Sequence, residues 1–88
     1  MAASPFPEQS RPASSTLADV EPGAGARVSA VDGATALGRR LLDLGFVPGT
    51  DVRVVRRAPL GDPVEYELRG YRLCLRRSEA LRIHVVPA

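Results

Sequence analysis

Cys74 and His84 are the only cysteine and the only histidine of the chain, and their side chains are its softest metal ligands. Zinc and ferrous iron both bind such side chains. Both residues are predicted on the outward faces of their strands. Two ligands do not complete a tetrahedral site, and no CxxC or HxxxH spacing is present, so a metal site would need acidic residues or a second copy. The alternative is a cysteine packed as a small hydrophobe and an exposed histidine.

All twelve basic residues are arginines, and many of them fall in two groups. The first group is Arg53, Arg56 and Arg57 on one predicted strand, and the second is Arg69, Arg72, Arg76 and Arg77 along a later hairpin. Arginine forks bind carboxylates and phosphates in bidentate geometry, which predicts a surface for anions or for an acidic partner. The alternative is a charge-balanced surface on which Asp62, Glu65 and Glu67 offset the arginines.

Nucleic acid is a disfavoured partner. The net charge is only +2, and the chain has four aromatic residues with which it could stack on bases. Phe6 lies in the N-terminal segment, while Tyr66 and Tyr71 are predicted to face the core. A small basic barrel that binds RNA remains the third hypothesis, and it would bind with an affinity that falls steeply with salt.

The sequence also disfavours an enzyme. No serine, histidine and aspartate are arranged around a nucleophile elbow, and Gly23-Ala24-Gly25 precedes a strand, which is the wrong context for a nucleotide-binding loop. Glu65 and Glu67 face the same way on one strand, and an exposed strand face explains them. We therefore expect no catalytic residues and no required cofactor.

The size and composition indicate one small cytosolic domain. A chain of 88 residues has a thin core. A single cysteine excludes an internal disulfide, and no apolar run approaches the roughly 20 residues of a membrane span. The N-terminus has no positive cluster followed by an apolar segment, so no secretory signal is expected. Any contact with a membrane would come through a partner.

Hydrophobic periodicity predicts a mainly β fold preceded by a disordered tail. Residues 1–25 are rich in Pro, Ser and Ala and are expected to be disordered, so that the folded domain spans residues 26–88. Strands are predicted at 27–31, 50–57, 64–68, 71–76 and 83–85, with a helix at 36–44 capped by Thr35 and a helical turn at 79–81 capped by Ser78. Five short strands fit a small barrel, and the helix between the first two strands would plug one end.

The stretch from Leu41 to Thr50 carries the strongest local signal. Gly45 is predicted to end the helix in the left-handed conformation, and Pro48-Gly49 fits a type II turn. With Ala58-Pro59-Leu60-Gly61-Asp62-Pro63 and Leu75-Arg76-Arg77, this stretch resembles the ferrous iron transport protein A (FeoA) family over about residues 26 to 86. The resemblance implies an SH3-like domain that serves ferrous iron uptake in the cytosol. Its implied partner is the large membrane transporter with a cytosolic GTP-binding domain, which it would dock on and regulate. The long N-terminal segment departs from the compact family pattern.

Four residues in turns and loops are candidates for partner contact: Phe46, Val47, Leu60 and Asp62. Apolar side chains on stiff loops lose little entropy on docking. Phe46 has an alternative role as the hydrophobic contact that accompanies a helix C-cap. Leu60 is the better candidate, because its loop has no evident core to reach. The alternative function is a module that binds zinc, iron or an anion and forms a homo-oligomer on binding.

Overall fold

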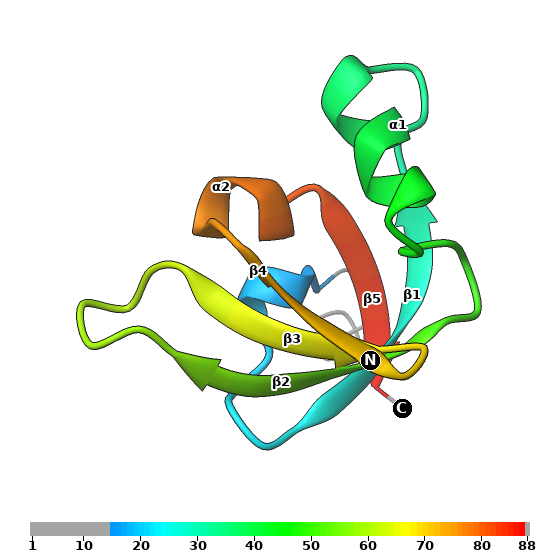
Figure 1. Cartoon of the computed structure of the whole chain (residues 1–88). Helices are drawn as coiled ribbons and strands as arrows, with labels where there is room; N and C mark the ends of the chain where they lie inside the picture. The colour runs from blue at the N-terminus through cyan, green and yellow to red at the C-terminus, as the bar shows by residue number, and fades with distance from the viewer. Residues whose placement is uncertain (1–14, 88) are drawn as a thin grey trace, which may run out of the picture.

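The computed structural model describes residues 15–87, which form one curled antiparallel sheet with two short α-helices (Figure 1). The elements in chain order are η3 (Leu17–Asp19), β1 (Gly25–Val31), α1 (Ala36–Asp43), β2 (Asp51–Arg57), β3 (Val64–Leu68), β4 (Tyr71–Leu75), α2 (Arg77–Ala80) and β5 (Ile83–Pro87). The strands are hydrogen-bonded in the order β4-β3-β2-β1-β5. The predicted mainly β fold, with a helix after the first strand and a helical turn before the last, is confirmed. Within the described residues β4 and β5 do not pair, so the sheet curls without closing.

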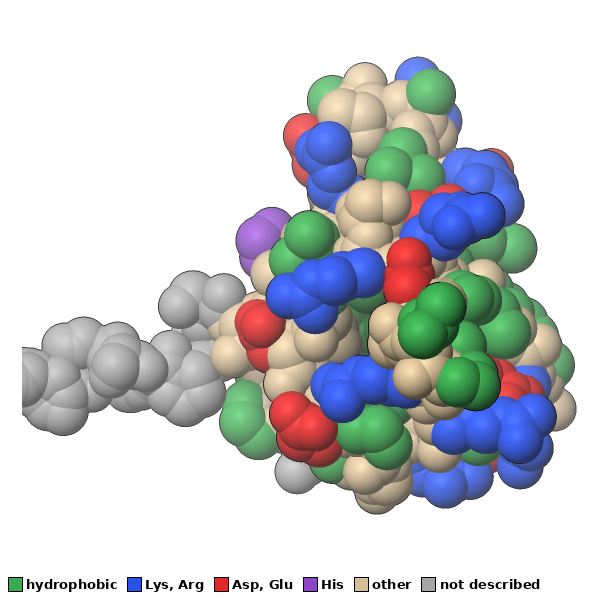
Figure 2. All heavy atoms as spheres, turned by 90° about the vertical axis from the view of Figure 1, so that its left-hand side faces the viewer, with side chains coloured by type: hydrophobic (Ala, Val, Ile, Leu, Met, Phe, Trp, Pro, Cys, Tyr) green, Lys and Arg blue, Asp and Glu red, His purple; other side chains and the backbone are tan. Residues whose placement is uncertain are grey.

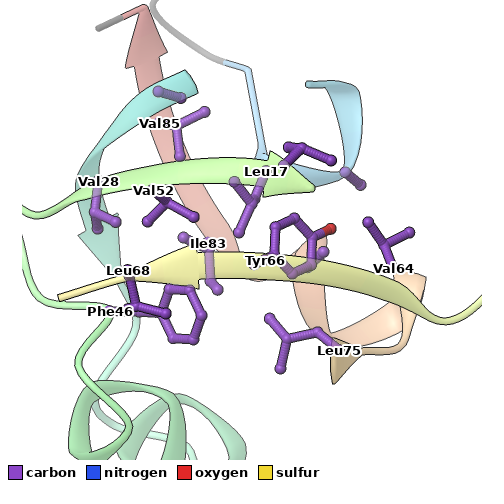
Figure 3. Close-up of a cluster of buried hydrophobic side chains, with 14 of the residues drawn as sticks. Leu17, Val28, Phe46, Val52, Val64, Tyr66, Leu68, Leu75, Ile83 and Val85 are labelled. Carbon is purple, nitrogen blue, oxygen red and sulfur yellow. The ribbon is translucent and has the colours of Figure 1, made fainter. Parts of the chain in front are cut away.

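The core lies inside the curl of the sheet, where alternate strand residues point (Figure 3). On β3, for example, Val64, Tyr66 and Leu68 are buried while the two intervening glutamates face outward. The buried hydrophobic residues are Leu17, Ala18, Ala26, Val28, Leu41, Phe46, Val52, Val54, Val64, Tyr66, Leu68, Leu75, Ala80, Ile83 and Val85. The core therefore draws on every strand, on both α-helices and on two segments outside them.

The helix and the turn after it form as their residues predict. The side chain of Thr35 accepts a hydrogen bond from the Gly38 amide at 2.9 Å, which caps the first turn of α1. Gly45 follows the helix with a φ of 113°. The Thr50 amide bonds the Val47 carbonyl at 3.0 Å across Pro48-Gly49, and the φ of Gly49 is 94°, as a type II turn requires.

The prediction that residues 15–25 belong to a disordered tail is wrong. Leu17 is only 1% exposed, and the short helix η3 packs it into the core. Ser15 accepts a hydrogen bond from the Val85 amide at 2.9 Å, and Ala24 accepts one from the Val54 amide at the same distance. These backbone bonds offset the low apolar content of the segment. The folded domain therefore includes residues 15–25, and the rest of the predicted tail lies outside the described residues.

Two smaller expectations are also wrong. The α2 turn begins after Arg76, whose amide donates to the Glu79 carboxylate at 2.9 Å, so Ser78 lies inside the helix and does not cap it. Tyr71 is 41% exposed rather than buried, because β4 is an edge strand and its first side chain lies at the rim of the core. The Tyr71 hydroxyl donates a hydrogen bond to the Leu44 carbonyl.

The Leu17→Ala substitution is expected to lower the free energy of unfolding by about 2–5 kcal/mol, because it leaves a cavity beneath η3. Urea denaturation followed by circular dichroism measures this loss. Leu60→Ala is the matched control, because Leu60 is 97% exposed and the same truncation there should change stability by less than about 0.5 kcal/mol. Equal stabilities of the two variants would mean that η3 does not contribute to the core in solution.

Among residues 15–87, no helix combines the length and the apolar character that crossing a lipid bilayer demands.

Candidate functional site

The loop between β2 and β3 presents the most exposed large hydrophobic side chain of the described residues. Leu60 is 97% exposed at its tip. The loop is internally bonded: the Gly61 amide donates to the Ala58 carbonyl at 2.7 Å, and the Ala58 amide donates to the Pro63 carbonyl at 2.9 Å. Pro59 occupies the second position of this turn, where its restricted φ is favoured. The hydrogen bonds therefore fix the loop in a conformation that leaves the Leu60 side chain exposed to solvent.

A contact with α2 holds the same loop in position. The Asp62 carboxylate accepts a hydrogen bond from the Arg77 amide at 2.8 Å, and this amide is the first of the helix. A carboxylate at the first turn of a helix satisfies an amide that has no partner within the helix. Asp62 was predicted as a contact for a partner, and the structure gives it this intramolecular bond while leaving the residue exposed.

Figure 2 shows the face of the molecule on which this loop lies, which is the left-hand side of Figure 1. Hydrophobic side chains gather near the middle of this face, with arginines and acidic residues around them (Figure 2). An open hollow of about 430 Å³ lies beside the loop. Its lining residues are Arg56, Arg57, Ala58, Pro59, Pro63, Glu65 and Cys74. A shallow, mixed surface of this kind suits a protein segment better than a small molecule, which requires a concave apolar pocket.

Phe46 does not belong to this surface, and its prediction as a partner contact is wrong. Its side chain is 0% exposed and packs under the sheet near Leu68 (Figure 3). The Phe46 amide bonds the Leu41 carbonyl at 3.1 Å as the chain leaves α1, which turns the ring inward. This is the alternative role, the hydrophobic contact of a helix C-cap. Val47 is half-buried in the following turn and stays a prediction.

Most of the predicted anion-binding arginines have carboxylate neighbours. Arg53 pairs with Glu67 at 2.5 Å, and Arg56 pairs with Glu65 at 2.9 Å. Arg57 lies 3.4 Å from Glu21, and Arg72 lies 4.0 Å from Glu67. Arg76 and Arg77, whose side chains form no ion pair with a described residue, stand at the start of α2. These pairs favour a charge-balanced surface over an anion site.

Cys74 and His84 are both exposed, as predicted, and they lie on two strands that do not pair with each other. Cys74 is on β4 and His84 is on β5, the two opposite ends of the strand order. In the described part of the chain, no group of three or more His, Cys, Asp or Glu side chains could hold a metal ion. A metal site that uses these two residues would therefore require ligands from more than one copy.

Tyr66 is buried, as the sequence predicts, and its side chain carries a hydroxyl group into the core. A small cavity of about 10 Å³ lies against it, lined in part by Arg57 and Arg77. Burial raises the pKa of Tyr66 to about 12, and the nearby arginines oppose this shift. The hydroxyl therefore stays protonated at neutral pH, and the cavity is too small for any ligand larger than a water molecule.

The model of one protein family, described as the FeoA domain, matches residues 15–87. The match covers all the residues that the structure describes. A fusion of Fe(2+) transport protein A with the Fe(2+) transporter FeoB, from Porphyromonas gingivalis, is 39% identical over 69 residues. This stretch covers 78% of the present chain and 8% of the fusion protein, so the chain is similar to a small part of that protein.

Solved structures show the same fold. The FeoA-like protein from Clostridium acetobutylicum is 36% identical and superposes with a TM-score of 0.79, covering 84% of this chain and 86% of its own. The FeoA of Stenotrophomonas maltophilia, solved in complex with zinc and described as a prokaryotic SH3 domain protein, is 37% identical with a TM-score of 0.72. That match covers 81% of this chain and 88% of the other. The expected SH3-like fold is thus confirmed.

Proposed function

The chain belongs to the FeoA family of ferrous iron transport, and on this premise we propose that it is a non-catalytic accessory protein that docks on FeoB, the ferrous iron transporter, and regulates it. The observation that carries the proposal is the fusion of FeoA and FeoB in one relative. Two domains that share a chain stay at high effective concentration, which favours contact between them. The proposed place of action is the cytoplasm, on the cytosolic part of the transporter.

The exposed loop supports a docking role. Leu60 stands in solvent on a turn braced by internal hydrogen bonds and by the bond from Arg77 to Asp62. A side chain already held in place loses little freedom on binding, so more of the contact energy appears as affinity. Leu60 and Asp62, in the loop after β2, are the contact residues that we propose, and the half-buried Val47, in the turn before β2, is a separate candidate.

The carboxylates support the non-catalytic part of the proposal. Glu65 and Glu67 are the pair that could have acted as acid and base, and they form ion pairs with Arg56 and Arg53. Both ion pairs lie on the outward face of the sheet, where each arginine holds one carboxylate to a neighbouring strand, and this suits a structural role.

The test is calorimetry of the purified chain with the cytosolic part of its cognate FeoB, in the presence of GTP or GDP analogues. Binding that depends on the nucleotide is expected of a regulator. Binding that is equal in both states would retain the docking and remove nucleotide-dependent regulation. No heat of binding in any state would overturn the proposal.

The Leu60→Glu substitution is expected to weaken this binding about tenfold or more, because an apolar anchor would be replaced by a charge. The melting temperature should stay unchanged, since the side chain touches no core. Ala36→Glu is the matched control: it adds the same charge at the exposed start of α1, where an acidic residue is tolerated. A Leu60→Glu variant that binds like the control would remove Leu60 from the interface.

The zinc complex of a similar FeoA favours a second candidate, an oligomer joined by zinc or ferrous iron. In this chain the ligands would be the exposed Cys74 of one copy and His84 of another, with acidic side chains beside them. Sedimentation of the chain with stoichiometric zinc tests this candidate. A larger species that the Cys74→Ser substitution abolishes would support it, and an unchanged monomer mass would exclude it.

A further inference from the structure

The strand β4 has one edge that no described residue pairs with. It joins β3 through the two-residue turn Arg69-Gly70, in which the φ values are 50° and 85°. Positive φ at both positions identifies a type I′ hairpin. The residues that flank such a turn, Leu68 and Tyr71, exchange backbone hydrogen bonds with each other. This anchors the hydrogen-bonding register of the whole β3–β4 ladder.

The register decides which backbone groups of β4 point away from the sheet. Bonded pairs alternate with non-bonded pairs in an antiparallel ladder. Tyr71, Leu73 and Leu75 therefore bond to β3, while the N–H and C=O groups of Arg72 and Cys74 point outward. Both outward-pointing residues are exposed, and no described backbone group outside the ladder bonds them. The edge thus offers donors and acceptors in the spacing that an added strand requires.

Positive and negative side chains alternate across the outer face of the sheet, and the last of them, at the edge of β4, is an arginine without a close carboxylate among the described residues. Arg53, Glu67 and Arg72 are cross-strand neighbours on β2, β3 and β4. The Glu67 Oε1 atom lies 2.5 Å from Nη2 of Arg53 and 4.0 Å from Nε of Arg72. The carboxylate of Glu67 is therefore bound mainly by Arg53. The side chain of Arg72 remains 54% exposed. Arg76, four residues later, is exposed and forms no ion pair with a described residue.

We propose that the outer edge of β4 accepts an extended, acidic segment of the FeoB transporter as an additional strand. Acidic side chains of that segment lie opposite Arg72 and Arg76 and continue the alternating charges of the sheet. Between them, an apolar side chain points to the other face and covers the half-buried Leu73. The inference rests on the proposed function, and it adds the site and the chemistry of the segment that binds there.

A second copy of the chain fits this edge poorly. Antiparallel pairing of two β4 strands centred on Arg72 or on Cys74 sets arginine directly against arginine, which is destabilising. Pairing centred on Leu73 places each Arg72 opposite the partner's Cys74 and leaves it without an acid. The charged edge therefore disfavours self-association and favours an acidic segment from another protein.

Hydrogen exchange of the full chain, alone and bound to full-length FeoB in detergent, tests the inference residue by residue. The complex is exchanged in deuterated water and dissociated, and the amides of the isotope-labelled chain are then read by NMR. Exchange at Arg72 and Cys74 is expected to slow at least tenfold in the complex. Binding without protection at these two amides would overturn the inference alone, whereas absence of binding would overturn the proposed function as well.

Charge reversal gives an independent test with the same complex. Arg72→Glu should weaken binding about tenfold or more, and Arg39→Glu, at an exposed position of α1 that forms no ion pair with a described residue, should not. Raising the salt concentration should reduce the difference in binding affinity between the Arg72→Glu variant and the unmodified chain, because salt screens exposed charges. Equal affinities of the two variants would remove Arg72 from the interface and overturn the proposed chemistry.

Discussion

The Phe46→Ala substitution is expected to lower the free energy of unfolding by about 3–5 kcal/mol, which is a large part of the stability of a domain this small. Phe46 is fully buried, and its ring fills the space between the end of α1 and the sheet (Figure 3). The alanine variant leaves a cavity there that the short helix cannot collapse to fill. Denaturation in urea, with the helix and strand signals followed together, measures the loss.

Val47→Ala is the matched control for this variant, because Val47 follows directly in the chain and is only half-buried. It should cost less than about 1 kcal/mol. The pair also separates the two roles that the sequence allowed for Phe46. If the Phe46→Ala variant kept its stability and lost only its binding to the transporter, Phe46 would be a docking residue and not a core residue.

Gly38→Ala is expected to destabilise the domain by about 2–3 kcal/mol, the reverse of what the same change does in most helices. Alanine is favoured over glycine inside a helix by about 1 kcal/mol. Here, however, a Cβ on Gly38 would stand 1.7 Å from the Asp32 carbonyl oxygen, which is backbone and cannot swing aside. The clash outweighs the gain in helix propensity. Thermal and urea denaturation of the purified variant give the sign and the size of the effect.

Arg39→Ala is the neighbouring control, since Arg39 is exposed and lies on the same turn of α1. It should change stability by less than about 0.5 kcal/mol. A Gly38→Ala variant more stable than the unmodified chain would show that the turn at Asp32 gives way at little cost.

Local rules predicted most of the fold. The alternation along Val64–Leu68 indicates one buried face, and glycines at positive φ mark the C-terminal end of α1 and several turns. Thr35 caps the helix because its side chain reaches an amide three residues on. Each of these signals is read from a few adjacent residues, and no distant part of the chain has to be known.

The failures concern residues whose surroundings are supplied by distant parts of the chain. Phe46 stands between glycine and valine in a turn, and only the curl of the sheet makes its position interior. Leu17 lies in a polar, proline-rich stretch whose composition predicts disorder, yet hydrogen bonds to β5 and β2 hold that stretch in the fold. A single apolar residue gives no periodicity from which such docking could be inferred.

The candidate site was predictable in part. Proline and glycine around Leu60 indicated an exposed, stiff loop, and the structure shows Leu60 exposed there. The bond from the Arg77 amide to Asp62 joins residues fifteen positions apart and has no local signature. The free edge of β4 could likewise not be predicted from the sequence, because the order of all five strands decides which strand lies at the edge of the sheet.

The two tyrosines give the chain two separate optical reporters. The protein has no tryptophan, so Tyr66 and Tyr71 dominate its intrinsic fluorescence. Tyr66 is sealed in the core, and its emission responds to unfolding. Tyr71 lies at the rim on β4, where a strand added at the edge would change its surroundings while the core stays intact. In a Tyr71→Phe chain the remaining emission would follow the folding of the core, and in a folded Tyr66→Phe chain it would report docking at the edge of β4, with no attached dye.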